Sequence, residues 1–201
     1  MSVHPAHDTA FFLQMAGQRE PYRRLADAID AALAPTPGAI CPQGSLLDLG
    51  CGVGCVTARL WERGWMAIGV DGAQAAQALK EDGVILLVRD LCDPEALRGF
   101  PVFDVVSCTE TAEHLPADAA ETLVAHCATK ARSYIVWSAA PPGAEWPGHQ
   151  NCQPGEFWLS LFEARGWLPD LMRTERLRHQ MRLRKAQHDG GADTFYVLAR
   201  R

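Results

Sequence analysis

The segment from Glu110 to His114 (ETAEH) carries three side chains that could act together in chemistry. Glu110 lies three residues before Glu113 and four before His114, so a helix through this segment would bring all three side chains onto one face. Two carboxylates and an imidazole form an oxygen-rich set that suits Mg²⁺ or Mn²⁺, and a cation would relieve the repulsion between the carboxylates. We therefore predict a divalent-metal site here. The alternative is a set of side chains that only braces the helix.

A second histidine, His149, follows an expected buried strand at residues 133–138 and lies in a turn-rich segment, PGHQNC. It is the candidate fourth ligand, beside Glu110, Glu113 and His114. It could instead act as a general base, because an imidazole with a pKa of about 6.5 can accept a proton from a hydroxyl group or a protonated amine. We therefore predict catalytic roles for His149, His114 and Glu110. The alternative for His149 is a turn histidine that hydrogen-bonds its own loop.

An apolar run that ends in a glycine-rich turn, SLLDLGCGVG at residues 45–54, lies upstream of these residues. The leucines fit a strand buried on both faces. Gly50, Gly52 and Gly54 permit a sharp turn and leave room for a ligand beside bare backbone amides. Helical spacing follows over residues 53–63, so the turn should open a helix whose first N–H groups point at the ligand. This combination predicts a nucleotide-type cofactor site.

Acidic residues at the expected strand ends narrow the choice of cofactor. Asp71 ends the second strand, where an acidic side chain accepts hydrogen bonds from ribose hydroxyls, and Asp90 follows the third, where a carboxylate can reach an adenine edge. Asp48 lies two residues before Gly50, where a cationic amino-acid ligand needs a carboxylate. The turn is shorter than the dinucleotide form, and we expect no second domain for a hydride acceptor. These features favour S-adenosylmethionine. A nicotinamide cofactor is the alternative.

Strands alternate with helices along the chain and predict a doubly wound, mostly parallel sheet of seven strands in a single domain. The expected strands are residues 45–49, 67–70, 84–88, 103–107, 133–138, 167 onward and 194–199, and the expected helices, besides the one after the glycine turn, are residues 8–33, 72–80, 117–129 and 155–165. A proline-rich break at residues 35–38 should end the first helix.

Composition limits the classes of function. With 201 residues, 48% of them hydrophobic, the chain suits one domain with a full core, and its net charge of −5 argues against a dedicated nucleic-acid binder. No apolar stretch approaches a membrane span and no secretory signal is recognisable, so we expect a cytoplasmic protein with reduced thiols. A zinc pair at Cys51 and Cys55 is the less favoured alternative. The basic run at residues 173–185 is expected to be a solvated connector rather than an RNA contact.

The motifs LLDLGCGVG, IGVD, RDL and FDVVSCTETAEHLP, in this order, resemble those of class I S-adenosylmethionine-dependent methyltransferases. The resemblance implies an antiparallel last strand, a helical lid at residues 1–40 and a cofactor-binding domain at residues 41–201. It also implies these cofactor contacts: Gly50, Cys51, Gly52 and Gly54 to the methionine moiety and ribose, Asp48 to the amino group, Asp71 to the ribose, Asp90 and Leu91 to the adenine, and Thr109 at the end of the fourth strand.

The ETAEH segment is similar to a metal-binding pattern of ubiquinone-biosynthesis O-methyltransferases and small-RNA 2′-O-methyltransferases, and the segment around His149 resembles a loop of small bacterial methyltransferases. We therefore expect O-methylation of a small molecule such as a sugar or secondary metabolite, by a monomer or homodimer. An RNA 2′-O-methyltransferase, an N-methyltransferase and a non-catalytic cofactor-binding subunit are the alternatives. Trp146, Phe157 and Trp158 could line the acceptor pocket, although core packing is the simpler role for Phe157 and Trp158.

Overall fold

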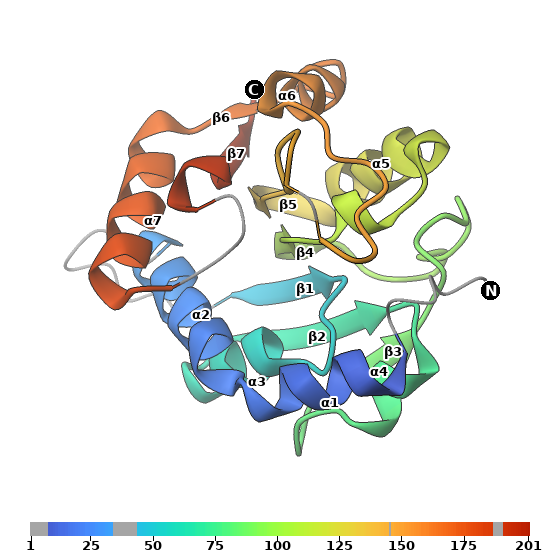
Figure 1. Cartoon of the computed structure of the whole chain (residues 1–201). Helices are drawn as coiled ribbons and strands as arrows, with labels where there is room; N and C mark the ends of the chain where they lie inside the picture. The colour runs from blue at the N-terminus through green and yellow to red at the C-terminus, as the bar shows by residue number, and fades with distance from the viewer. Residues whose placement is uncertain (1–7, 34–43, 145, 187–190) are drawn as a thin grey trace.

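The computed structural model describes residues 8–33, 44–144, 146–186 and 191–201 and contains a seven-stranded sheet. The strand order is β3-β2-β1-β4-β5-β7-β6, and β7 runs antiparallel to both of its neighbours while β1 to β5 are parallel (Figure 1). This is the sheet predicted from the sequence. The strands are β1 (Ser45–Leu49), β2 (Met66–Asp71), β3 (Leu86–Val88), β4 (Phe103–Cys108), β5 (Ala131–Trp137), β6 (Trp167–Pro169) and β7 (Tyr196–Arg200).

Helices cover both faces of the sheet (Figure 1). The helices are α1 (Thr9–Gly17), α2 (Arg19–Leu33), α3 (Cys55–Glu62), α4 (Gln74–Ala78), α5 (Ala120–Lys130), α6 (Gly155–Glu163) and α7 (Leu171–Arg184), with 3₁₀ turns η1 (Ala112–His114), η2 (Ala117–Ala119) and η3 (Ala192–Thr194). Leu46 of β1 packs with α2, α3 and α7, whereas the next residue, Leu47, packs with α5 and α6. Successive side chains of a strand point to opposite faces, so the central strands carry apolar residues on both faces because both faces are buried.

The helix predicted over residues 8–33 is divided in two. α1 begins at its N-cap Asp8, whose carboxylate accepts a hydrogen bond from the Phe11 N–H, and it ends at Gly17. Gln18 leaves the helical conformation, and α2 starts at the next residue. Glycine weakens a helix because it has the most backbone freedom to lose. The break predicted at residues 35–38 lies outside the described residues.

The basic run near the C-terminus connects β6 to β7, as predicted, but it forms helix α7, and one face of this helix is buried. Asp170 caps the helix by accepting a hydrogen bond from the Arg173 N–H, and Thr174, Leu177 and Met181 are buried against the domain. These three residues recur at helical spacing and form one apolar stripe. Charged residues between them obscured that stripe in the sequence.

Candidate active site

The glycine turn is hydrogen-bonded mainly to the neighbouring strand. The N–H groups of Gly50 and Cys51 donate to the Val70 carbonyl at 2.8 and 3.1 Å, and the Gly52 N–H donates to Oδ2 of Asp71 at 2.9 Å. These amides therefore hold the turn against the end of β2, although the sequence suggested bare amides directed at a ligand. The fixed turn places the ends of β1 and β2 side by side, at the edge of the sheet where ligands bind in such folds.

Two glycines of the turn have no space for a side chain. Gly50 has a φ of 74°, and a Cβ there would lie 2.2 Å from Oγ1 of Thr111. Gly52 has a φ of 55°, and its Cβ would lie 2.4 Å from Sδ of Met15 in α1. Positive φ values and close neighbours both require glycine at these positions. The expected close approach at the turn is therefore present, but it is made by protein side chains.

Asp48 lies beneath the turn with 3% of its surface exposed. Its Oδ2 accepts a hydrogen bond from Oγ1 of Thr57 in α3 at 2.8 Å. Burial raises the pKa of Asp48 from 3.8 to about 6, and the hydrogen bond from Thr57 opposes that rise. Asp48 therefore ties β1 to α3, and any effect on a cofactor amino group would pass through backbone or water, as the sequence suggested.

Asp71 has both carboxylate oxygens engaged with the backbone but retains acceptor capacity. Oδ2 accepts from the Gly52 N–H and Oδ1 accepts from the Ala73 N–H, each at 2.9 Å. Burial raises the pKa of Asp71, and these hydrogen bonds oppose the rise. A backbone hydrogen bond from Gly72 also opposes the rise. An ionised carboxylate offers about four lone-pair sites, so about one direction remains for a ribose hydroxyl. The ribose contact stays a prediction.

The predicted adenine-side residues follow β3. Oδ1 of Asp90 accepts a hydrogen bond from the Cys92 N–H at 3.0 Å, which closes a turn directly after the strand, and Leu91 is buried. Thr109 follows β4, and its carbonyl accepts a hydrogen bond from Oγ1 of Thr111 at 3.0 Å. These residues lie beyond the carboxyl ends of parallel strands, where the cofactor was expected.

Glu110 adopts a left-handed conformation, with a φ of 50°. Its N–H donates to the carbonyl of Ser138 at 3.2 Å and to Oγ of Ser138 at 3.1 Å, and that hydroxyl donates to Oε1 of Glu110 at 2.6 Å. The segment is therefore not a helix from Glu110 onward, and only Ala112–His114 form a 3₁₀ turn. The prediction that a helix gathers both glutamates and the histidine is wrong, because Ser138 holds Glu110 at the end of β5.

Glu113, His114 and His149 do come together. One ligand atom from each lies within 4.8 Å of the others, and the two imidazole rings are 4.8 Å apart between centroids. Glu113 is buried, whereas the histidines are half-buried. Among the described residues this cluster does not include Glu110. Three of the four predicted metal ligands are therefore adjacent, and one carboxylate stands apart.

Backbone carbonyls set the orientation of both imidazoles. Nδ1 of His149 lies 2.9 Å from the Ala144 carbonyl, and Nδ1 of His114 lies 3.3 Å from the Gly148 carbonyl. Because a carbonyl can only accept, Nδ1 is the protonated nitrogen of each ring when it is neutral, and Nε2 carries the lone pair. This is the arrangement in which a histidine ligates a metal or accepts a proton.

The loop that carries His149 is fastened to the segment after β4. The N–H groups of Gln150 and Asn151 both donate to the Glu113 carbonyl, at 2.8 and 3.1 Å, and the Gln150 side chain donates to the His114 carbonyl at 2.6 Å. These bonds join residues far apart in the sequence and bring His149 beside Glu113. They are the interactions that assemble the cluster.

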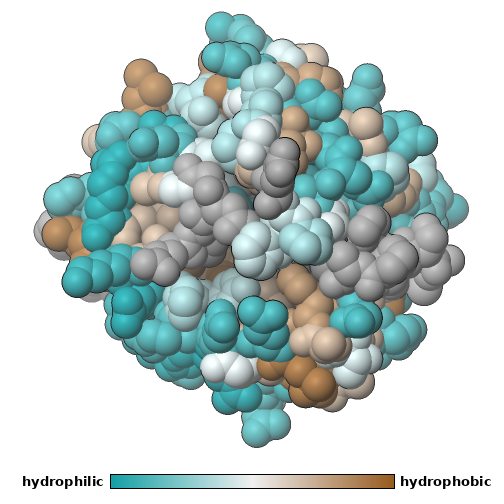
Figure 2. Space-filling view, in the orientation of Figure 1, coloured by the Kyte–Doolittle hydropathy of each residue, from teal (hydrophilic) through white to brown (hydrophobic). Residues whose placement is uncertain are grey.

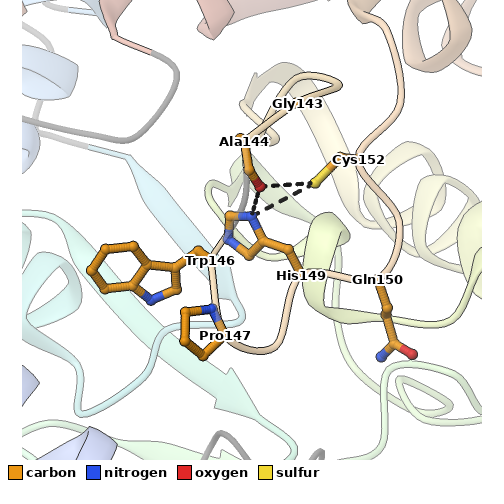
Figure 3. A pocket seen from close by; sticks show the side chains of 7 residues that line it. All are labelled: Gly143, Ala144, Trp146, Pro147, His149, Gln150 and Cys152. Carbon is orange, nitrogen blue, oxygen red and sulfur yellow. Dashed lines mark hydrogen bonds between the residues drawn. The ribbon is translucent and has the colours of Figure 1, made fainter.

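An open pocket of about 590 Å³ lies in this loop. Figure 3 shows one ring nitrogen of His149 facing both the Ala144 carbonyl and Cys152, with Trp146 and Pro147 on the other side of the ring. The lining residues are Gly143, Ala144, Trp146, Pro147, His149, Gln150 and Cys152. Trp158 is buried against Trp137, so it belongs to the core. The pocket therefore presents an imidazole beside an exposed indole and a proline ring.

The two cysteines near the glycine turn are poor metal ligands. Burial raises the pKa of Cys51, and burial together with the Glu81 carboxylate raises the pKa of Cys55 to about 12. Metal binding requires the thiolate, which these environments disfavour. The cysteines of the described residues form no disulfide with one another.

The sequence of residues 15–184 matches the family described as methyltransferase domain. The chain belongs to the methyltransferase domain family. This membership confirms the family predicted from the motifs and excludes the nicotinamide alternative. Of the residues that the structure describes, none form a helix long and apolar enough to cross a membrane.

Individual relatives of this methyltransferase domain differ in the atom that they methylate. It is 32% identical over 100 residues to a ubiquinone biosynthesis O-methyltransferase of Pseudomonas paraeruginosa, a match that covers 47% of this chain and 43% of that protein. The alignment thus spans less than half of that relative. Two solved structures share the fold. An S-adenosylmethionine-dependent methyltransferase of Archaeoglobus fulgidus has a TM-score of 0.67 and 20% sequence identity, and the match covers 96% of this chain and 100% of that one. A sugar N-methyltransferase of a Streptoalloteichus species has a TM-score of 0.65 and 17% sequence identity, and the match covers 97% of this chain and 93% of that one.

Proposed function

We propose that this methyltransferase domain transfers the methyl group of S-adenosylmethionine to a hydroxyl group of a small molecule bound in the His149 pocket. The observation that carries the proposal is the cluster of Glu113, His114 and His149, of which His149 lines the pocket. Glu113 follows Thr111 by two residues, and the Thr111 side chain lies against Gly50 of the glycine turn, where the cofactor is expected. The partial match to O-methyltransferases supports oxygen as the acceptor atom.

The reaction needs the acceptor oxygen in line with the bond between the cofactor sulfur and its methyl carbon. A carbon–oxygen bond forms, the carbon–sulfur bond breaks with its electrons returning to the sulfonium, and the hydroxyl loses a proton. Nε2 of His149 carries the lone pair that can accept this proton, because the Ala144 carbonyl holds Nδ1–H. The products are the methyl ether, S-adenosylhomocysteine and the protonated base.

The same cluster fits a divalent cation. Glu113 supplies a buried carboxylate, and His114 and His149 each supply an Nε2 whose ring is fixed through Nδ1. We propose these three side chains as the ligands of Mg²⁺ or Mn²⁺, with Glu110 outside the set because Ser138 holds its carboxylate. A bound cation would occupy the Nε2 lone pair of His149 and would lower the pKa of an acceptor hydroxyl instead, so proton acceptance by His149 belongs to the metal-free site.

The arginines of α7 favour a small acceptor over RNA. Arg173 pairs with Asp170 at 2.8 Å and Arg178 pairs with Glu175 at 3.2 Å. Arg182 pairs with Asp193. Acidic partners reduce the net positive charge that phosphate binding requires. We therefore propose a neutral or weakly charged small acceptor for the pocket.

Calorimetric titration with S-adenosylhomocysteine tests the cofactor, and release of this product in the presence of sugars and phenols tests the acceptor. Binding without turnover on any acceptor would indicate the non-catalytic subunit, and nitrogen-methylated products would refute the choice of oxygen. Titration with Mn²⁺ of the wild type and of the Glu113→Gln variant tests the metal site. No difference in Mn²⁺ binding between the two proteins, or full activity after exhaustive chelation, would refute it.

A further inference from the structure

Each glycine of the turn has a protein side chain against its Cα. The nearest side chains are Thr111 at Gly50, Met15 at Gly52 and Val84 at Gly54. A cofactor that lies against the turn on the side of a glycine's absent Cβ would have to displace the side chain that fills this space. The three neighbours differ in how firmly they are held.

Thr111 and Val84 are fixed parts of the domain. Oγ1 of Thr111 donates to the carbonyls of Leu49 and Thr109, and 7% of the residue is exposed. Val84 is equally buried and packs in a cluster with β3 and Cys51. Moving either side chain would disrupt buried packing around the turn. The remaining neighbour, Met15, lies on a peripheral helix.

Helix α1 is attached through one small apolar cluster. Phe12 is the only fully buried residue of this helix and packs with residues around the starts of α3 and α4, with Met15 half-buried against them, whereas Leu13 is 55% exposed. An ion pair of 2.8 Å links Arg19, just after α1, to Glu81, but 55% of the Arg19 side chain is exposed, and such pairs stabilise little. Helices of this length are marginal without tertiary support, and α1 is separated from α2 at Gln18. Figure 2 shows hydrophobic surface gathered over α1.

We propose that Met15 is an internal competitor of the cofactor, with its thioether and methyl group resting on Gly52 where the methionine moiety of S-adenosylmethionine would lie. This inference rests on the proposed function. The cofactor then binds only the fraction of molecules in which α1 has withdrawn Met15. The apparent dissociation constant equals the intrinsic one divided by that fraction, so Met15 sets the apparent affinity without contacting the acceptor.

Shortening Met15 tests this competition. In calorimetric titrations of the full chain with S-adenosylhomocysteine, Met15→Ala should bind about three- to tenfold more tightly, as expected for loss of a half-buried methionine contact. Met15→Leu keeps a similar volume and should stay within about twofold of the wild type. Leu13→Ala removes an exposed side chain from the same helix and should leave the affinity unchanged. Unchanged or weaker binding by Met15→Ala would overturn the inference.

Hydrogen exchange of the α1 amides gives an independent readout. Adding S-adenosylhomocysteine to the wild-type protein should accelerate exchange at Thr9–Gly17, because the helix loses its contact with the turn. Slower exchange would mean that α1 closes over the cofactor, and would overturn the inference while leaving the proposed function intact. Failure of the wild type and of Met15→Ala alike to bind S-adenosylhomocysteine would refute the proposed function and the inference with it.

Discussion

Replacing Asp48 with asparagine should stabilise the folded protein at neutral pH. The Asp48 carboxyl has a folded-state pKa of about 6 against an ordinary 3.8, because burial disfavours its charged form. Since folding raises this pKa, the stabilisation contributed by the protonated carboxyl is complete below the unfolded-state pKa and is lost as the pH rises through about 6. The difference between these two pKa values corresponds to about 3 kcal/mol in the free energy of unfolding. Asparagine is neutral at every pH and can still accept the hydrogen bond from Thr57.

Urea unfolding from about pH 4 to pH 8 measures this effect. The stability advantage of Asp48→Asn should be near zero at about pH 4 and reach about 3 kcal/mol above pH 7. Asp104→Asn is the contrasting control, because the Ser45 N–H, together with Arg132, lowers the pKa of Asp104. Loss of that carboxylate should destabilise the protein at neutral pH, with the deficit vanishing in acid. Parallel pH profiles for the wild type and Asp48→Asn would refute the reasoning.

Three further substitutions follow from the site. Gly50→Ala should lower the free energy of unfolding by at least about 2 kcal/mol, measured by thermal unfolding, because a neighbouring threonine fills the space of the added Cβ. Gly83 has a similar φ but open space around it, so Gly83→Ala should lower the free energy of unfolding by only about 1 kcal/mol. The sequence predicts a catalytic role for Glu110, so Ser138→Ala, which removes the hydroxyl bonded to the Glu110 carboxylate, should lower kcat at least about tenfold and change the S-adenosylhomocysteine Kd less than about twofold. An unaltered kcat would contradict that role. Asp71→Asn should weaken S-adenosylhomocysteine binding about tenfold in calorimetry, and equal affinity would show that this carboxylate only supports the turn.

The strands and the glycine turn were predictable because their signals are local. Three of the four residues at 46–49 are leucines, and they face both sides of the strand, which requires burial on both faces and hence a parallel sheet between helices. The break between α1 and α2 and the helix α7 were missed for a different reason. Gly17 is only a weak helix breaker, and the apolar stripe through Leu177 is interrupted by arginines, so tertiary packing decided both outcomes.

The active-site residues were predictable as a set, but their grouping was not. Glu113, His114 and His149 were expected to act together, and they do lie together. Glu110 departs from them because its partner Ser138 is 28 residues away in the sequence, on another strand. Only the pairing of β4 with β5 brings these two side chains into contact. No local pattern carries that information.

The hydrogen bonds between the His149 loop and Glu113 fix the base of this loop, whereas the side chains at its tip can be exchanged. The N–H groups of Gln150 and Asn151 donate to the Glu113 carbonyl, and the His149 N–H donates to the Trp146 carbonyl, so backbone groups anchor His149. The side chains of Trp146 and Pro147 lie at the exposed tip and line the pocket. Exchange of tip residues would thus re-shape the proposed acceptor pocket while the reacting groups keep their positions, so a single scaffold of this kind can diversify its acceptors.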